Sequence, residues 1–279
     1  MSYILFDIGG TKTRLAASED LKSFSEPVSF KTPKDFDEAM ALIAETVKKL
    51  GVSSVRGMGG GIRGVLTEDR TAIANDSALS GWIEKPLVAT LEKMFDTTVV
   101  LENDSAVVGL GEAHHGAGQG VEIMVYHTVS TGVGGVKIEN GMIDDYNVGF
   151  EPGKQILDID RTVLGEDVTP TLENLVSGTA LEARTGQKPY DIPQTDAVWD
   201  QLAGYLAYGL RNTIMYWSPD MIVLGGSMIV GDPRIMLDDI IRHTQESLGD
   251  EVPCPLMKDA QLGDLGGLYG AMALLNQHV

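Results

Sequence analysis

The sequence predicts an α/β protein built from two similar halves. A short apolar strand followed by a glycine-rich turn occurs twice, first from Tyr3 and again from Ile123. Between the two copies, the apolar run 97–101 leads to an acidic residue, Asp104, where a strand ends and a helix begins. Open α/β sheets bind their ligands at the carboxyl ends of the strands. The pattern therefore predicts a site in which a general base works beside two phosphate-binding turns.

Composition indicates a soluble globular protein and excludes several partners. The chain has 279 residues, 43% of them apolar, and 21 basic against 40 acidic side chains give a net charge of −19. A chain of this length buries roughly three quarters of its surface, in one large domain or two ordinary ones. An acidic chain without a run of Lys or Arg repels nucleic acid and anionic membranes. No apolar run reaches the length of a membrane span and no secretory leader is recognisable, so we expect a cytoplasmic protein.

The first glycine turn follows the strand 3–6. Two adjacent glycines let a backbone approach a phosphate closely, and neighbouring hydroxyl groups can donate hydrogen bonds. The acid at the strand end is a candidate for holding hydrated Mg²⁺. An ordinary hairpin explains the same residues, because Gly-Gly is common in tight turns and 14–17 could pair back. The two interpretations are compatible, and the candidate residues for binding a nucleotide and its metal are Asp7, Gly9, Gly10, Thr11 and Lys12.

The segment between this turn and Asp104 supplies core and a further candidate site. An apolar stripe predicts a helix over 32–50, which Thr32 caps. The run 59–64, Gly-Gly-Gly-Ile-Arg-Gly, matches the dinucleotide-binding fingerprint, but the residues after it predict a strand and a turn instead of a helix. We therefore reject that interpretation. We expect these glycines, Gly61 among them, to form a flat loop against which a small polar ligand lies, followed by a polar segment that contains Asn75.

Asp104 is the residue on which the functional interpretation depends. A helix is predicted over 105–115, directly after it. Because a helix N-terminus lowers the pKa of a carboxylate at its start, we expect Asp104 to be ionised and ready to accept a proton. Asn103 beside it can hydrogen-bond a ligand hydroxyl. The structural alternative is that Asp104 merely caps the helix, a role that aspartate fills very often. The local sequence favours capping, and only the neighbouring motifs favour the base.

The second half repeats the strand and the turn. The strand 122–128 is closed by 130–135, Ser-Thr-Gly-Val-Gly-Gly, and the hairpin that follows turns at Asn140 and Gly141. A strand at 221–224 leads to a third glycine turn. Further helices are predicted over 171–184 with a break at Ser177 and Gly178, over 195–217, over 232–249 and over 262–275.

Two carboxylates of the second half are further candidates. Glu151 lies in the loop 148–154 and has no obvious structural duty, and Glu173 lies on a predicted helix, where a solvated side chain is the simpler explanation. The histidines lack metal-ligand spacing and are interpreted as structural or solvent-facing. These are His114, His115 and His127.

Six short motifs, taken together and in order, resemble the ROK family of sugar kinases along nearly the whole chain. The resemblance implies the actin-like (ribonuclease H-like) ATPase fold, with duplicated mixed sheets flanked by helices. It also implies a smaller domain of residues 1–107 plus 264–279 and a larger domain of residues 108–263. The motifs begin at Asp7, Leu101, Ser130, Glu173, Leu224 and Gly267.

The resemblance implies an ATP-dependent hexose kinase that uses Mg²⁺. Asp104 would take the proton from a hexose hydroxyl. Glucose is the default acceptor and N-acetylmannosamine its nearest rival, and a homodimer is left open. The hexose-binding residues would be Gly61, Asn75, Asn103, Asp104, Glu151 and Glu173. Those near ATP, beyond the first turn, would be Thr131, Gly132, Gly225 and Gly226.

The chain departs from the family pattern in ways that bear on the sugar. Lys154 stands where members commonly carry a His, and the segment 158–171 contains no cysteine, so we predict no structural zinc. The usual Gly-x-Pro-Gly is replaced at 59–62 by a more flexible run. Two alternatives follow: a sugar sensor without catalysis, and a different actin-fold ATPase with a protein client. The intact Asp104 and both glycine turns argue against the sensor.

Overall fold

The computed structural model describes residues 1–147, 149–250 and 252–279, and the chain divides into two compact units. The expected boundary after residue 107 falls inside a helix that stays whole in unit 1. Val148, in the loop expected over 148–154, lies outside the described residues. Unit 1 comprises Met1–His115, Asp145–Gly149 and Asp264–Val279, and unit 2 comprises Gly116–Asp144 and Phe150–Gly263.

Unit 1 contains a five-stranded mixed sheet with the order β3-β2-β1-β4-β7. The first three strands along the chain are antiparallel neighbours, whereas β4 and β7 run parallel to β1. Asp7 pairs with Gly61, and Gly61 pairs with Glu102, so the parallel strands end at one edge. The strands are β1 (Ser2–Ile8), β2 (Lys12–Ser18), β3 (Val28–Lys31), β4 (Val55–Ile62) and β7 (Val99–Asn103), with a separate small hairpin of β5 (Val65–Leu66) and β6 (Ile73–Asn75).

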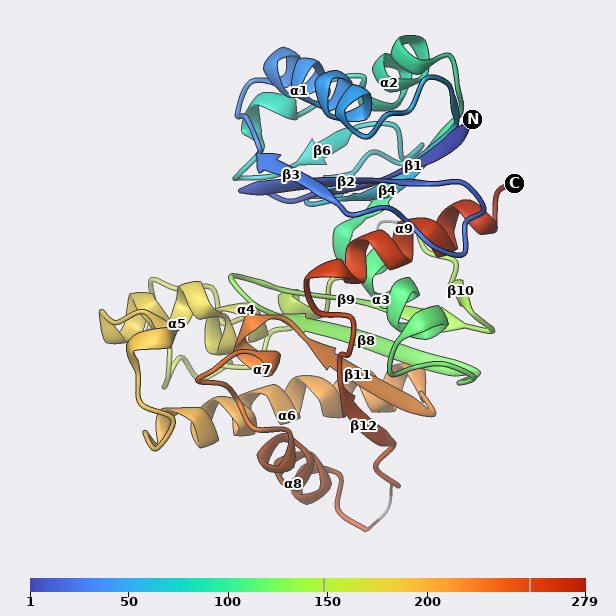
Figure 1. Ribbon diagram of the computed structural model, residues 1–279. Coiled ribbons are helices and arrows are strands. Elements are labelled where there is room, and N and C mark those ends of the chain that lie inside the picture. Colours follow the sequence, from blue (N-terminus) through green and yellow to red (C-terminus); the bar gives the residue numbers. More distant parts are fainter. Residues whose placement is uncertain (148, 251) are drawn as a thin grey trace. The chain divides into compact units, whose positions relative to one another are not determined.

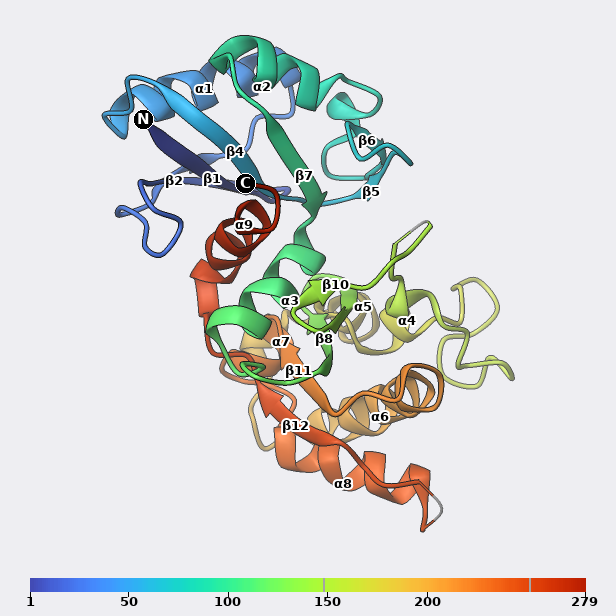
Figure 2. The ribbon, with the colours of Figure 1, turned by 90° about the vertical axis from the view of Figure 1, so that its right-hand side faces the viewer.

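Helices cover both faces of this sheet. The helices α1 (Phe36–Lys49) and α2 (Leu87–Phe95) pack on one face, where they bury alternate β1 side chains such as Phe6 (Figure 1). The helices α3 (Asp104–His115) and α9 (Gly266–Asn276) lie side by side on the other face (Figures 1 and 2). The two helices approach closely. A Cβ added at Gly111 of α3 would lie only 2.6 Å from the Gly266 carbonyl oxygen, so no side chain fits there. Gly270 of α9 likewise lies against the Val107 carbonyl oxygen of α3, so these glycines serve close packing.

Two expectations about local structure in unit 1 were wrong. The glycines of 59–61 do not form a loop; they are buried within β4, because Leu275 of α9 packs directly on Gly59, leaving no room for a side chain there. The helix α1 is capped by Asp35, whose carboxylate accepts a hydrogen bond from the Glu38 N–H at 2.9 Å. Thr32 is instead buried and donates to the Gly9 carbonyl oxygen, at 2.8 Å. That bond ties the start of the helix segment to the first glycine turn.

Unit 2 repeats the sheet, with the order β10-β9-β8-β11-β12. Its first three strands are again antiparallel neighbours, and β11 and β12 are parallel to β8. Asn140 and Gly141 both have positive φ, as the predicted hairpin turn requires. The strands are β8 (Ile123–Val129), β9 (Val133–Glu139), β10 (Met142–Ile143), β11 (Met221–Gly225) and β12 (Leu256–Asp259).

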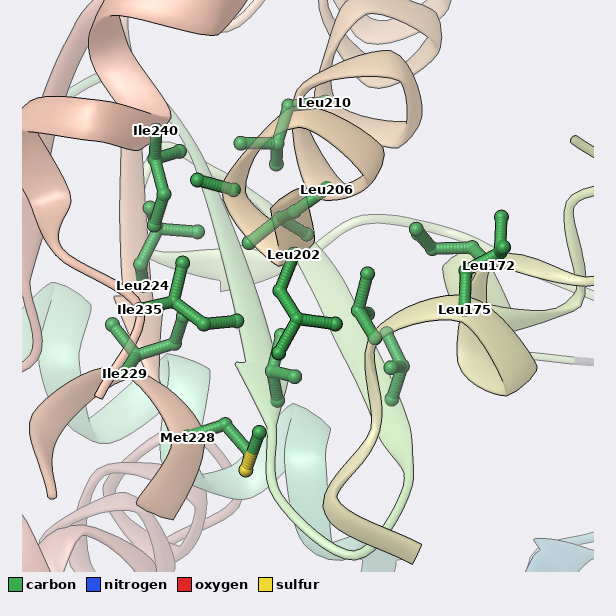
Figure 3. Close-up of a cluster of buried hydrophobic side chains, with 14 of the residues drawn as sticks. Leu172, Leu175, Leu202, Leu206, Leu210, Leu224, Met228, Ile229, Ile235 and Ile240 are labelled. Carbon is green, nitrogen blue, oxygen red and sulfur yellow. The ribbon is translucent and has the colours of Figure 1, made fainter. Parts of the chain in front are cut away.

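The core of unit 2 lies between this sheet and its helices. Leucines at one face of α6 pack with residues of α8 and of β11 (Figure 3). The predicted break at Ser177 is confirmed: its hydroxyl accepts from the Ala180 N–H and caps the second helix. The helices are α4 (Leu172–Val176), α5 (Gly178–Thr185), α6 (Val198–Trp217), α7 (Ser227–Val230) and α8 (Leu237–Leu248), with short 3₁₀ turns η1 (Ser80–Trp82, in unit 1), η2 (Pro152–Lys154), η3 (Pro189–Asp191) and η4 (Gly263–Leu265). Within the parts of the chain that the structure describes, no helix is both long and apolar enough to cross a membrane.

Candidate functional site

Asn103, and not Asp104, caps α3. Its side-chain oxygen accepts hydrogen bonds from the backbone N–H groups of Ser105, at 3.0 Å, and Ala106, at 3.3 Å. Its amide nitrogen donates to the Gly64 carbonyl oxygen at 3.1 Å, which leaves one amide N–H for a ligand. The Oδ1 atom of Asp104 accepts from the Ser105 N–H at 2.8 Å, and no hydrogen bond within the described part of the chain involves its Oδ2. The Asp104 carboxylate is therefore oriented, with one oxygen unused.

The expectation that the helix start lowers the pKa of Asp104 was wrong. Burial raises the pKa of this carboxyl, and the opposing effects of the Ser105 N–H and of the Arg63 charge are smaller. The carboxylate loses more by leaving water than it gains from the helix end and the guanidinium. A pKa raised from the ordinary aspartate range is closer to neutrality, which is favourable for a general base that must release its proton again.

The sequence interpretation missed an ion pair beside Asp104. The Arg63 Nε atom donates to the Asp76 carboxylate at 2.8 Å, and the same carboxylate accepts N–H groups of the turn that follows it. Arg63 also lies against the first glycine turn, because a Cβ added at Gly10 would lie 2.9 Å from its Cδ. Asn75, next to Asp76, is exposed at the end of β6. Arg63 is the only basic residue in the glycine run 59–64, and that was the available signal.

A second missed group supports the strand that leads to Asp104. The Glu102 carboxylate is buried and accepts hydrogen bonds from Arg70, at 3.1 Å, and from the Tyr146 hydroxyl. The Arg70 guanidinium lies 4.3 Å from the centre of the Tyr146 ring. Burial and the Glu102 charge raise the pKa of Tyr146, so the phenol stays a hydrogen-bond donor. Glu102 also accepts from the Asn103 N–H at 2.7 Å and thereby holds the backbone next to the base.

Asp7 lies at the same sheet edge. Its carboxylate accepts from Arg14 at 3.1 Å, and Arg14 also donates to Asp264 at 3.0 Å. Burial raises the pKa of Asp7 to about 6, with the Asp104 charge adding to the rise and Arg14 opposing it. The Oδ1 atom of Asp7 takes part in no hydrogen bond within the described residues, so the carboxylate fits a hydrated Mg²⁺, which binds few protein ligands and keeps several waters.

The first glycine turn is the expected hairpin between β1 and β2. The Gly9 N–H donates to the Lys12 carbonyl oxygen at 3.0 Å, while Thr11 and Lys12 are exposed. The residue after β3 also holds the turn, because the Thr32 N–H donates to the Thr11 carbonyl oxygen at 2.9 Å. Its exposed hydroxyl and glycine backbone remain suited to binding a phosphate.

The second glycine turn is held by residues from two helices of unit 2. The Glu173 carboxylate accepts from the Val133 N–H at 2.9 Å and lies where a side chain at Gly132 would otherwise stand. The Gly178 N–H donates to the Ser130 carbonyl oxygen at 2.7 Å. Thr131 at the tip is exposed. The third turn adjoins this one, since the hydroxyl of Ser130 and that of Ser227, which follows Gly225 and Gly226, are 3.0 Å apart.

Lys154 forms an ion pair with Glu173. The Lys154 Nζ atom lies 2.8 Å from a Glu173 oxygen, and Glu173 uses its other oxygen for the Val133 N–H. The hydrogen bond to Glu173 raises the pKa of Lys154, and the Glu151 charge adds to the rise. Glu151 itself is exposed at the start of η2. The structure thus groups Glu173, Lys154 and the charge of Glu151 beside the second glycine turn.

The segment expected to lack zinc is organised by a carboxylate. Asp158 accepts hydrogen bonds from three successive N–H groups, those of Thr162, Val163 and Leu164, at distances from 2.7 to 3.3 Å. Among the residues that the structure describes, no group of three or more His, Cys, Asp or Glu side chains could hold a metal ion. The absence of structural zinc remains a prediction.

Comparisons with known proteins cover nearly the whole chain. A family profile described as the ROK family matches residues 3–278. A fructokinase from Lactococcus lactis subsp. cremoris is 27% identical over 99% of this chain and 98% of its own. An N-acetyl-D-glucosamine kinase from Escherichia fergusonii is 30% identical over 98% of each chain. The crystal structure of a ROK hexokinase from Thermus thermophilus aligns with a TM-score of 0.82, 27% identity, and coverage of 100% and 99%.

Proposed function

Because this chain belongs to the ROK family and is an ATP-dependent sugar kinase with the actin-like ATPase fold, we propose that Asp104 is its general base and glucose its acceptor. The observation that supports the base is the state of its carboxylate. Burial raises the pKa of Asp104, the Ser105 N–H fixes Oδ1, and Oδ2 is unused. A carboxylate with a raised pKa and one unused oxygen can accept a proton and release it again.

In the proposed mechanism, Asp104 Oδ2 accepts the proton of a hexose hydroxyl while that hydroxyl oxygen attacks the γ-phosphorus of ATP. The bond from the γ-phosphorus to the bridging oxygen breaks, and ADP leaves. General-base help of this kind contributes ~10²- to 10⁴-fold. The larger share comes from positioning the reactants and from donors on the transferring phosphoryl group. The Arg63 charge opposes the rise of the Asp104 pKa that burial causes.

The remaining candidate residues bind the substrates in this proposal. The N–H groups of the two glycine turns, with Gly225 and Gly226, hold ATP, and Asp7 holds Mg²⁺ through water. When bound, Mg²⁺ neutralises charge on the phosphates. The hexose hydroxyls are bound by Asn103, Glu151 and Glu173, with Gly61 and Asn75 beside them. Lys154 keeps Glu173 in place with an ammonium group, where the family commonly uses an imidazole.

Glucose is proposed because its hydroxyls offer a partner to each of Asn103, Glu151 and Glu173. A second candidate is an N-acetylhexosamine, favoured by the 30% identical relative named an N-acetyl-D-glucosamine kinase. The relative named a fructokinase makes fructose a further member of the panel to be tested. A single added substituent changes the specificity of a pocket by only ~10- to 200-fold, so the acceptor has to be found by measurement.

The test is ADP release from MgATP with glucose, fructose, mannose, N-acetylglucosamine and N-acetylmannosamine, together with the variant Asp104→Asn. We expect sugar-dependent turnover, highest with glucose, and a loss in kcat on the order of 10³-fold in the variant, with hexose binding retained in calorimetry. Asp37→Asn, an exposed aspartate on α1, is the matched control and should keep its kcat.

Each part of the proposal can fail separately. A kcat within tenfold of wild type in Asp104→Asn would show that another group is the base. Turnover that is highest with another sugar would replace glucose as the acceptor and leave the base assignment standing. Hexose binding without ADP release from the wild type would favour the sensor.

A further inference from the structure

Unit 2 contains a cavity of about 430 Å³ that none of the candidate site residues lines. It lies beside α6, which contributes Tyr205, Tyr208 and Arg211 to the wall, and Leu175 of α4 forms another part. Asn212 of α6 and the loop that begins at Leu157 contribute the remainder. A volume of this size falls within the range of small-molecule sites, roughly 300–1,000 Å³.

The polar groups of this cavity include a guanidinium and two phenols that can donate hydrogen bonds. Arg211 uses its Nε atom to donate to the Ser247 carbonyl oxygen at 3.0 Å, and within the described residues its two terminal nitrogens form no ion pair or hydrogen bond. The hydroxyls of Tyr205 and Tyr208 likewise have no hydrogen bond there. The acid in the lining, Asp158, is occupied by the backbone N–H groups of its own loop. A ligand would therefore meet the Arg211 guanidinium and phenol donors. The Asp158 carboxylate keeps its negative charge, but the N–H groups of its own loop hold it.

The remaining walls are apolar or aromatic. Leu157, Val163 and Leu175 supply aliphatic surface, and Tyr205 and Tyr208 supply rings that can lie against a flat group. The chain as a whole carries a net charge of −19, so only local donors can hold an anion here. We propose that this cavity binds a small organic anion whose carboxylate or phosphate accepts hydrogen bonds from Arg211 and whose body packs between the tyrosines.

The cavity is connected to the proposed hexose-binding groups of unit 2 by hydrogen bonds. Asn212 in its lining donates to the Gln155 side-chain oxygen at 2.8 Å, and Gln155 donates to the Pro152 carbonyl oxygen of η2 at 2.9 Å. The Leu172 N–H of α4 donates to the Gln155 carbonyl oxygen at 2.9 Å. Because η2 ends with Lys154 and α4 carries Glu173, an anion bound here changes the hexose affinity; this consequence rests on the proposed function.

Binding is tested with phenyl phosphate, benzoate and inorganic phosphate, titrated into the full chain by calorimetry in the presence of saturating MgADP and glucose. Phenyl phosphate and benzoate separate a phosphate source from a carboxylate source, and inorganic phosphate lacks the flat body. We expect phenyl phosphate to bind if the natural ligand is a phosphate and benzoate to bind if it is a carboxylate, each more tightly than inorganic phosphate. The affinity of the phenyl compound that binds should fall about tenfold or more in Arg211→Gln and about threefold or more in Tyr208→Ala.

The controls keep the test decisive. Arg56→Gln removes the same charge from an exposed site of unit 1 and should leave the affinity unchanged. Tyr208 is 58% exposed, so its truncation leaves the fold intact even where Arg211→Gln does not. No binding of any probe at millimolar concentration, equal affinity in Arg211→Gln, or binding that excludes ATP or hexose completely would overturn the proposal.

The consequence for the hexose is measured separately. Calorimetric hexose affinity, with and without the bound probe, should change by the same factor as the probe affinity with and without hexose. Probe binding without this coupling would remove the link through Gln155 but keep the site. If the wild type shows no sugar-dependent ADP release, the proposed function is contradicted, but the probe titration can still be interpreted.

Discussion

Unit 1 and unit 2 have the same strand order but place their charges differently. In each, a glycine turn follows the first strand of an antiparallel hairpin. In unit 1 the last residue but one of that strand is an acid, Asp7, which is ion-paired with Arg14. The same position of the first strand of unit 2, the last residue but one of β8, is the neutral Thr128. The acid that serves the second turn, Glu173, comes from a helix.

The difference shows which part of the site belongs to the duplicated fold. Sheet and turn are repeated, so the backbone that can meet a phosphate is present twice. The carboxylates differ because each unit adds them from its own segments, and their burial differs accordingly. Asp104 and Asp7 have raised pKa values through burial, whereas Lys154 and Glu173 form a partly exposed pair. Proton transfer therefore belongs to unit 1, in our proposal, and ligand binding to both.

The two units differ most at the buried residues just before Asp7 and Thr128. These are Phe6 in unit 1 and His127 in unit 2. Burial lowers the pKa of His127 to about 4, from an ordinary value of 6.5. Its Nε2 atom lies 3.0 Å from the Thr213 hydroxyl, but Nδ1 has no partner. The unfolded chain binds a proton below pH 6.5 and the folded one does not, so stability falls as the pH drops from 6.5 to 4, by about 3 kcal/mol in full. His127→Phe should remove this loss in urea unfolding, with exposed His114→Phe as control.

Asp7 should act in the opposite direction in unit 1. Its folded pKa of about 6 exceeds the ordinary 3.8, so the folded state takes up the proton first. Stability from this group therefore rises as the pH drops from 6 to 3.8, by about 3 kcal/mol in full. Asp7→Asn should steepen the acid loss of the whole chain between pH 6 and 4, measured by the same urea unfolding. An unchanged pH dependence, equal to that of Asp37→Asn, would mean that the two units do not differ in this way.

The exposed pair of unit 2 should affect binding more than turnover. Glu173→Gln keeps an acceptor for the Val133 N–H but removes the charge that Lys154 faces. We expect the KM for the hexose to rise about tenfold, with kcat changed less than about threefold. Lys154→Gln should add little in the double variant, because both changes break the same pair. Glu182→Gln, which removes a second lysine-paired glutamate on α5, is the control, and an equal effect there would contradict the assignment.

The smallest effect is expected at the loop that Asp158 organises. Asp158→Asn should lower Tm by a few degrees, about 2–4 °C, because an amide oxygen accepts the three N–H groups less strongly than a carboxylate does. Asp69→Asn, in a comparable turn of unit 1, provides the matched change. Treatment with a metal chelator should leave Tm of the wild type unaltered. A fall in Tm after chelation would show that the loop needs a metal after all.

Periodicity and turn chemistry were enough to predict the duplicated α/β fold and the junction at Asp104. The helix break at Ser177 was also predictable, because a capping hydroxyl followed by glycine has a local signature. The run 59–61 was misjudged because the reason for its glycines lies far away in the sequence, in the side chain of Leu275. A packing partner at that separation leaves no local pattern.

Single candidate residues could be named from the sequence, and their roles as a site stay a prediction; the contacts between them could not be predicted. Asn103 and Asp104 were both singled out, yet the capping role fell to Asn103, since either side chain could accept the same N–H groups. The pKa of Asp104 could not be predicted, because it depends on burial and on Arg63, which only the folded chain brings near. The pair of Lys154 with Glu173 likewise joins η2 to α4 and has no sequence spacing to reveal it.

The packing of α9 on α3 has a consequence for how the protein is made. The helix that covers α3 is encoded after all of unit 2, although it belongs to unit 1. During translation, the N-terminal residues emerge first. The face of α3 that packs against α9 stays uncovered until residues 266–276 leave the ribosome. The half that carries Asp104 is therefore finished last. A prematurely terminated chain would contain every candidate residue from Asp7 to Gly226 and still lack a completed unit 1.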